Sequence, residues 1–176
     1  LETKNTSLVF SVKSNLKVIQ SYYGKKFAGD SGYEKLQGGR EIYLTAGMEN
    51  QFEPAIRVVH ADGNPSLELL YVSGSENKAD SNVSTTSIIL KDPVYQVTVI
   101  LHYRVYYNED VIESWTEIKN QEKNAILLTK YASSLLHFNS DGYWLTQFHG
   151  DWAREMQMVE EKLSYGIKTI ESKLGT

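Results

Sequence analysis

The sequence predicts an all-β sandwich of antiparallel sheets, and three observations support this fold class. Apolar residues recur at every second position over long stretches, which is the period of a strand with one buried face. Short strand-like runs are separated by polar turn clusters, as is typical of sandwiches. The 176 residues also include twelve tyrosines, three tryptophans and five phenylalanines, and aromatic side chains suit pleated surfaces.

The stretch from residue 97 to residue 107 has the clearest strand pattern. Polar residues such as Thr98, His102 and Arg104 alternate there with apolar or aromatic ones. This alternation predicts a long strand with one face in the core and one face toward solvent. The apolar face consists of Val97, Val99, Leu101, Tyr103, Val105 and Tyr107.

The other predicted strands are shorter and lie between turn-forming residues. In chain order they cover residues 8–12, 16–18, 56–58, 67–72, 87–90, 111–118 and 125–136. Polar clusters predict turns over 61–65, 108–110 and 120–124. Two looser zones are predicted to be long surface loops: the glycine-rich residues 24–41 and the Ser-, Asn- and Thr-rich residues 73–86.

The C-terminal segment fits two interpretations. Asp151 could be the N-cap of a helix over residues 151–163, with Glu and Lys side chains on its surface. Against a helix, Gly166 interrupts the segment, and residues 167–172 alternate in the manner of a strand. Periodicity alone leaves both interpretations open.

Length and composition indicate a single globular domain over residues 1–176. Hydrophobic residues make up 41% of the chain and charged residues 23%, which are ordinary values. The net charge of −4 disfavours nucleic acid as a partner, because a phosphate-binding surface needs a basic excess. No apolar run approaches the roughly 18–20 residues that span a bilayer, so no membrane partner is expected.

The sequence has no cysteine, which excludes disulfides, zinc–thiolate sites and cysteine nucleophiles. No metal or cofactor is predicted, because metal-ligand spacing is missing from the four histidines, His60, His102, His137 and His149. The lack of cysteine fits the cytoplasm and the periplasm or an exported location equally well. Because the chain begins with Leu1 rather than Met, we expect a trimmed or processed N-terminus; a targeting segment is not present in these residues, and localisation stays open.

One predicted strand face has the composition of a sugar-binding surface. Glu113, Trp115 and Glu117 lie on the same face of the strand over 111–118, because side chains alternate along a strand. Glycosidases place two carboxylates around a sugar, and aromatic rings stack on the apolar faces of pyranoses. The alternative is an outer sheet face on which Trp115 packs against a neighbour, and this is the favoured interpretation because such alternation is common on antiparallel sheets.

The C-terminal residues contain a specific series of short segments. In order they are Trp152-Ala153-Arg154-Glu155, then Leu163 and Gly166, then Ile170-Glu171-Ser172 and Gly175. This series resembles the N-terminal domain of glycoside hydrolase family 36, the alpha-galactosidases. The segments over 117–120 and 131–134 are also similar to family segments, and the resemblance is most specific from residue 94 onward. Over residues 1–93 it is weaker, although Phe52-Glu53-Pro54-Ala55 is similar to a family stretch.

The resemblance implies a two-sheet antiparallel β-supersandwich of the galactose mutarotase-like type, with strands rather than a helix in both closing runs. In the family this domain precedes a catalytic (β/α)8 barrel, which holds the two catalytic aspartates. We therefore expect the barrel after residue 176 and no catalytic residue in this chain. The implied function is the non-catalytic N-terminal domain of a bacterial, retaining alpha-galactosidase acting on terminal alpha-D-galactosides of the raffinose type. The implied partners are its own barrel, further copies in a homo-oligomer and the galactoside substrate.

The resemblance also implies site residues. In some relatives a loop of this domain reaches an active site, near an aspartate just before a Pro-Ala pair. Residues 49–54 hold no aspartate here, so Glu49 and Glu53 are the candidate substrate contacts, together with Trp115. Trp152, Arg154 and Glu155 are expected to form a structural turn that contacts its neighbours or the barrel.

Two other functions fit the same residues. One is a free-standing carbohydrate-binding β-sandwich, with Trp115 or Trp144 as the stacking platform. The other is a purely structural interaction module.

Overall fold

The computed structural model describes residues 1–27, 30–47 and 52–171 of the chain. The chain divides into two compact units, Leu1–His137 and Phe138–Thr176. The prediction that residues 1–176 form one domain stays a prediction. In the described part, no helix has the length and apolar character needed to cross a bilayer.

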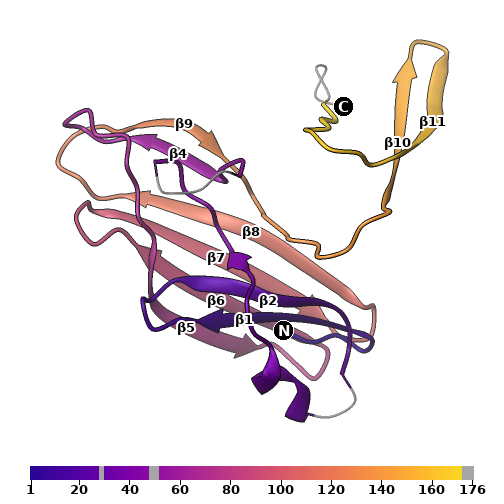
Figure 1. The fold of residues 1–176 in the computed structure, drawn as a ribbon, viewed down its shortest axis with the longest axis horizontal. Helices are drawn as coiled ribbons and strands as arrows, with labels where there is room; N and C mark the ends of the chain where they lie inside the picture. Colours follow the sequence, from indigo (N-terminus) through magenta and orange to yellow (C-terminus); the bar gives the residue numbers. More distant parts are fainter. Residues whose placement is uncertain (28–29, 48–51, 172–176) are drawn as a thin grey trace. The chain divides into compact units, whose positions relative to one another are not determined.

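The first unit is built from antiparallel strands in three sheets (Figure 1). One sheet has the order β1-β2-β3 and comprises Thr6–Val12, Val18–Lys25 and Arg40–Glu41. A larger sheet has the order β5-β6-β7-β8 and comprises Leu70–Lys78, Val83–Lys91, Val97–Tyr106 and Val111–Asn120. A short pair joins β4 and β9, which comprise Ile56–Val59 and Leu127–Tyr131. The all-β fold class with antiparallel sheets is therefore confirmed.

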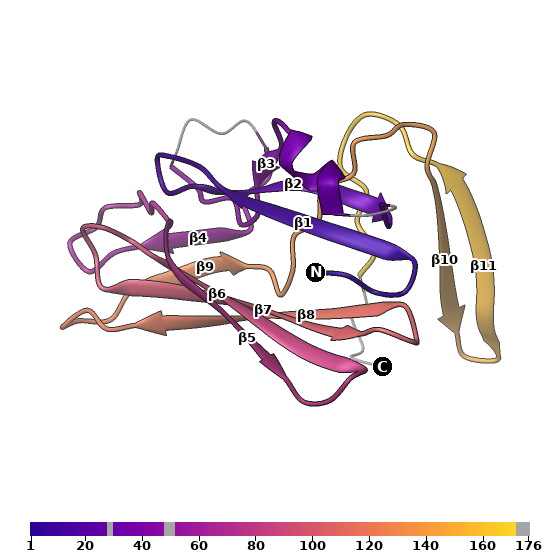
Figure 2. The ribbon, with the colours of Figure 1, turned by 90° about the horizontal axis from the view of Figure 1, so that it is seen from below.

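The β1–β2 layer lies over the β5–β8 sheet, and the core fills the space between them (Figure 2). Strand β7 has a neighbour on each side and contributes Val97, Val99 and Leu101 to the core. From the opposing layer Leu8 and Val18 meet them. The predicted alternation is thus confirmed from Val97 to Val105, because this face of the strand is covered by a second layer, whereas Tyr107 lies beyond β7 and is exposed.

The prediction of a surface loop over residues 73–86 is wrong. These residues form most of the β5–β6 hairpin, which pairs continuously from Ser73↔Ile89 to Lys78↔Ser84. Their side chains are polar, so the sequence lacks the apolar alternation that marks a strand with one buried face. Backbone hydrogen bonding to β6 maintains the strand where the core side chains have ended.

Other boundaries differ from the prediction. Residues 67–69 are irregular although Leu67 and Leu69 are buried, and the strand begins at Leu70. Residues 24–41 were predicted to be one long loop, but among those described the first two end β2, Asp30–Lys35 form the 3-10 helix η1, and Arg40–Glu41 form β3. Of the predicted strand 125–136 only β9 forms. Residues 132–136 leave the ladder, and the hydroxyl of Tyr43 donates a 2.7 Å hydrogen bond to the carbonyl of Ala132.

The second unit is a two-stranded antiparallel hairpin of β10 (Trp144–Asp151) and β11 (Arg154–Lys162). The strand interpretation of residues 151–163 is therefore confirmed over its paired residues. The second closing run is not a strand over its described residues, 167–171. Ile167 and Ile170 are exposed there, and no neighbouring strand supplies the hydrogen-bond ladder that a strand requires. Ser172 and Gly175 lie outside the described residues.

Candidate functional site

The first candidate site is the acidic segment before β4. Glu53 lies two residues before the buried Ala55, and its carboxylate pairs with the ammonium group of Lys130 on β9. The Lys130 ammonium holds the pKa of Glu53 below its ordinary value, so the side chain stays ionised. Glu49 lies outside the described residues.

A cleft of about 760 Å³ lies next to this segment, with Phe52 in its lining. The guanidinium of Arg40 lies 4.0 Å from the ring centroid of Phe52, which is a cation–π distance. The buried ammonium of Lys17 lies 3.5 Å from a carboxylate oxygen of Glu41 and 3.5 Å from one of Glu68. The cleft therefore combines an aromatic ring with both signs of charge.

Gly39 is required in the wall of this cleft. Its φ is +119°, and a Cβ atom at this position would lie 2.2 Å from the carbonyl oxygen of Gln20. Only glycine fits this backbone conformation and this close approach. The backbone conformation of the turn before β3 therefore depends on glycine at position 39.

The second candidate site is the solvent face of β8. Trp115 lies opposite His102 of β7, and the two rings stack with centroids 4.9 Å apart. The guanidinium of Arg104 lies 5.2 Å from the Trp115 centroid. Two side chains of β7 therefore interact with the Trp115 ring, His102 by stacking and Arg104 by a cation–π contact.

The two glutamates beside Trp115 also form ion pairs with neighbouring cations. Glu113 lies 3.5 Å from the guanidinium of Arg104, and Glu117 lies 3.1 Å from the ammonium of Lys119. Lys119 holds the pKa of Glu117 below its ordinary value. A catalytic acid needs the opposite shift, because it must stay protonated until it protonates the leaving group. The face has the properties of a salt-bridged outer sheet surface.

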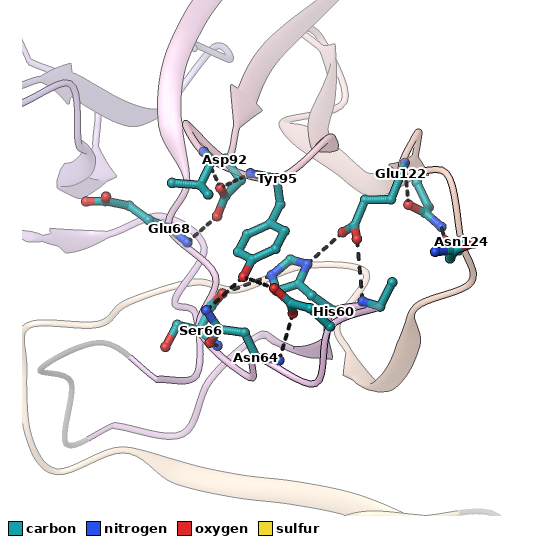
Figure 3. A network of polar contacts seen from close by, with 12 residues as sticks. His60, Asn64, Ser66, Glu68, Asp92, Tyr95, Glu122 and Asn124 are labelled. Atoms are coloured by element: carbon teal, nitrogen blue, oxygen red, sulfur yellow. Dashed lines mark hydrogen bonds and ion pairs between the residues drawn. The ribbon is translucent and has the colours of Figure 1, made fainter.

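The third candidate is a polar network at one end of the sandwich (Figure 3). His60 is buried, and its Nδ1 lies 2.7 Å from a carboxylate oxygen of Glu122. Its Nε2 lies 2.9 Å from the carbonyl oxygen of Ser66. The ring of Tyr95 stacks on the imidazole with centroids 3.5 Å apart and planes 7° apart. This network connects the turns that follow β4, β6 and β8.

Further hydrogen bonds hold Tyr95 in place. Its hydroxyl donates to Asp62 at 2.9 Å and accepts from the side-chain amide of Asn64 at 2.8 Å. The backbone N–H of Asn64 and the Tyr95 hydroxyl lower the pKa of Asp62, and Asp62 in turn raises the pKa of Tyr95. Asp92 accepts the backbone N–H of Tyr95 at 2.7 Å.

Sequence reasoning identified the turns at 61–65 and 120–124, but not the turn after β6 and not the meeting of the three. His60 is buried, and both of its ring nitrogens have polar partners, Glu122 and the carbonyl oxygen of Ser66. The order of the strands could have indicated that these turns meet, because alternate turns of an antiparallel meander lie at the same end of the sheet. The turns after β6 and β8 satisfy this relation, since the β7–β8 turn lies at the opposite end.

The last candidate is the turn of the β10–β11 hairpin. Trp152 is 93% exposed, and Arg154 and Glu155 are exposed as well. The carboxylate of Asp151 accepts the backbone N–H of Trp152 at 2.7 Å, which fixes the turn. Met156 beside the turn is also exposed. The residues expected to be a structural motif therefore form a turn with an exposed apolar surface.

A comparison of the chain with protein families matches residues 17–176 to the glycosyl hydrolase family 36 N-terminal domain. The chain belongs to this family. Alpha-galactosidase 1 of Pediococcus pentosaceus is 29% identical over 148 residues, which is 76% of this chain and 20% of the relative. The chain therefore spans about a fifth of the length of the curated relatives that it matches.

Solved structures of the family have the same fold. The alpha-galactosidase of Lactobacillus brevis superposes with a TM-score of 0.89 at 23% identity, covering 98% of this chain and 28% of that one. The family 36 alpha-galactosidase AgaA of Geobacillus stearothermophilus gives a TM-score of 0.89 at 19% identity, covering 98% and 29%. A variant of AgaA was solved in complex with raffinose. The family membership suggested by the C-terminal segments is thus confirmed.

In the described part of the chain, no group of three or more His, Cys, Asp or Glu side chains could hold a metal ion. The roles predicted for Glu49, Glu53, Trp115, Trp152, Arg154 and Glu155 stay predictions.

Proposed function

We propose that this family 36 N-terminal domain is the non-catalytic part of a retaining alpha-galactosidase that hydrolyses terminal alpha-D-galactosides. The main support is the family match over residues 17–176, together with curated relatives that are alpha-galactosidases. Raffinose-type sugars are the proposed substrates, because a relative with this fold was solved with raffinose. A barrel that follows this domain supplies the nucleophile and the acid/base.

The ion pairs made by the acidic side chains support a non-catalytic role for this domain. A retaining glycosidase needs two carboxyl groups about 5–5.5 Å apart, of which one remains protonated to act as the acid. Glu53 pairs with Lys130, Glu113 with Arg104, and Glu117 with Lys119. Carboxylates that are paired with cations stay ionised and are poor general acids.

The proposed mechanical role is to buttress the barrel and to support contacts between copies. The unit from residue 138 exposes large apolar side chains, including Trp144, Phe148, Trp152, Met156 and Met158. Several large exposed apolar side chains in one small unit indicate a contact site, because water solvates them poorly. The turn with Trp152, Arg154 and Glu155 is the proposed centre of that contact.

Substrate contact is proposed for the segment before β4. Glu53 is ionised, and a carboxylate accepts hydrogen bonds from sugar hydroxyl groups. Glu49 lies in the same segment and is the second proposed contact. Trp115 remains the third, although His102 stacks on its ring.

The proposal is tested by an assay of two proteins on a nitrophenyl alpha-galactoside. We expect turnover by the whole protein and none by residues 1–176 alone. Turnover by residues 1–176 would refute the non-catalytic role, and a whole protein without turnover would refute the enzyme.

A carbohydrate-binding module is the second candidate, favoured by the exposed ring of Trp144. Calorimetric titration of residues 1–176 with galactose and raffinose separates the two functions. Binding that Trp115→Ala or Trp144→Ala abolishes supports the module, and no binding at these rings supports the scaffold.

A further inference from the structure

A shallow cavity of about 340 Å³ lies beside the His60 network, where the turns after β4, β6 and β8 meet. Its lining includes Asp62, Tyr95, Gln96, Glu122 and Asn124. None of these residues was a candidate in the sequence, and none takes part in the proposed buttressing. The cavity combines an aromatic ring, two amides and two carboxylates.

We propose that this cavity binds a single neutral pyranose ring. Tyr95 is the platform on which the apolar face of the sugar stacks, and Gln96 and Asn124 hydrogen-bond its hydroxyl groups. The proposal goes beyond the scaffold function and does not depend on catalysis.

The platform is fixed before any ligand arrives. His60 covers one face of the Tyr95 ring at a centroid distance of 3.5 Å, and Tyr95 also lines the cavity. Asp62 and Asn64 hold the hydroxyl, while Asp92 holds the backbone N–H (Figure 3). A ligand therefore meets a ring whose rotamer is already set, which removes part of the entropic cost of binding.

The amides have unused hydrogen-bonding capacity. Within the part of the chain that the structure describes, the side chains of Gln96 and Asn124 are exposed and make no hydrogen bond. Each amide offers both donors and an acceptor, and sugar hydroxyl groups need both. One carboxylate oxygen of Glu122 has only a 3.5 Å contact, with the backbone N–H of Ala61. It is available as a further acceptor.

The residues that line the cavity favour a neutral, polar ligand. Among the described residues that line the cavity, Lys123 is one cation against two carboxylates, Asp62 and Glu122, so phosphate and other anions are disfavoured. The cavity is open and five of its eight lining residues are polar or charged, which disfavours lipids and other apolar ligands. Its volume lies at the lower end of the roughly 300–1,000 Å³ of small-molecule sites, which suits one sugar ring.

The test combines a crystal soak with titrations in solution, both on the whole protein. Crystals are soaked with methyl alpha-galactoside and with raffinose, and we expect a sugar ring against Tyr95 within hydrogen-bonding distance of Gln96 and Asn124. In solution, saturation-transfer NMR gives the affinity of the wild type and of a Gln96→Ala/Asn124→Ala double variant. We expect about a tenfold loss of affinity at this site in the variant, because two hydrogen bonds are removed.

Gln121→Ala is the matched control, because Gln121 is an exposed amide in the same turn that does not line the cavity. We expect it to bind like the wild type, and we expect all three proteins to turn over a nitrophenyl alpha-galactoside equally. An empty cavity in the soaked crystals overturns the proposal, as does equal sugar affinity of the double variant and the wild type. A protein that lacks turnover but binds sugar at Tyr95 would refute the proposed enzyme and leave this site standing.

Discussion

Strands β7 and β11 have similar lengths but opposite surroundings. On β7, Val97 and Val99 are 0% exposed, whereas on β11 Met156 is 71% exposed and Met158 is 62% exposed. β7 has a strand on each side and a second layer over one face, whereas β11 pairs with β10 alone. The comparison teaches that neighbours determine whether an apolar strand becomes core.

Because of the same difference, we expect the first unit to be more stable than the second. The sandwich supplies its own core from two layers, so its burial is internal to residues 1–137. A two-stranded hairpin is marginal in water by itself. We therefore expect the β10–β11 hairpin to require cover from outside the hairpin, and the buttressing contact proposed above would supply it.

The largest expected effect is a cavity in the sandwich core. Leu101→Ala should lower the free energy of unfolding of residues 1–176 by about 2–5 kcal/mol, because Leu101 is buried between the layers. Met158→Ala in the hairpin should change it by less than about 0.5 kcal/mol. Urea unfolding measures both, and equal losses would break the comparison between the two regions.

The next largest effect concerns the buried imidazole of His60. Glu122→Ala removes the carboxylate that faces Nδ1 of His60, and an unsatisfied buried polar group costs about 1–3 kcal/mol. Glu160→Ala is the matched change in the hairpin, where Glu160 accepts a hydrogen bond from Thr146 at an exposed position. Thermal unfolding should show a clear shift for the first variant only. A stable Glu122→Ala protein would show that the network does not hold the three turns.

A smaller effect depends on pH. The hydroxyl of Thr3, followed by Asn5, donates to Asp110 and holds the pKa of its carboxyl below the ordinary value. Because the folded pKa is the lower one, the stabilisation is present above the unfolded pKa and is lost as pH falls through the folded pKa. Asp110→Asn should therefore reduce the acid-side slope of stability against pH. An unchanged slope in urea titrations below pH 5 would contradict this assignment.

The smallest expected effect on stability is at the exposed ring of Trp152. Trp152→Ser should change the unfolding free energy of residues 1–176 by less than about 0.5 kcal/mol, because nothing in this unit covers the ring. In the whole protein the same change should lower the unfolding temperature, since the proposed contact is lost. Equal behaviour of the whole protein with and without the change would argue against a contact at Trp152.

The sequence predicted those strands that can be recognised from the pattern of neighbouring residues alone. The alternation in residues 97–107 identified β7, and the predicted strand over 8–12 lies within β1. It failed at β5, whose polar residues pair through backbone bonds that leave no apolar pattern. It also failed at residues 167–171, where an alternating pattern found no neighbouring strand in the described structure.

Candidate sites were harder to predict than strands, because their contacts join residues distant in the sequence. Glu53 was named, but its partner Lys130 lies 77 positions away. The stacking of Tyr95 on His60 joins two turns that only the assembled sheet brings together. Family segments such as Trp152-Ala153-Arg154-Glu155 did predict the family, because they need no knowledge of contacts.

Hydrogen exchange on two samples tests the central claim most directly: residues 1–176 alone, and the same residues within the whole protein. The scaffold account predicts that the amides of β6 and β7 are equally protected in both samples. It predicts that the amides of β10 and β11 are protected only in the whole protein, where the catalytic domain covers the hairpin. A hairpin equally protected in both samples would contradict the account.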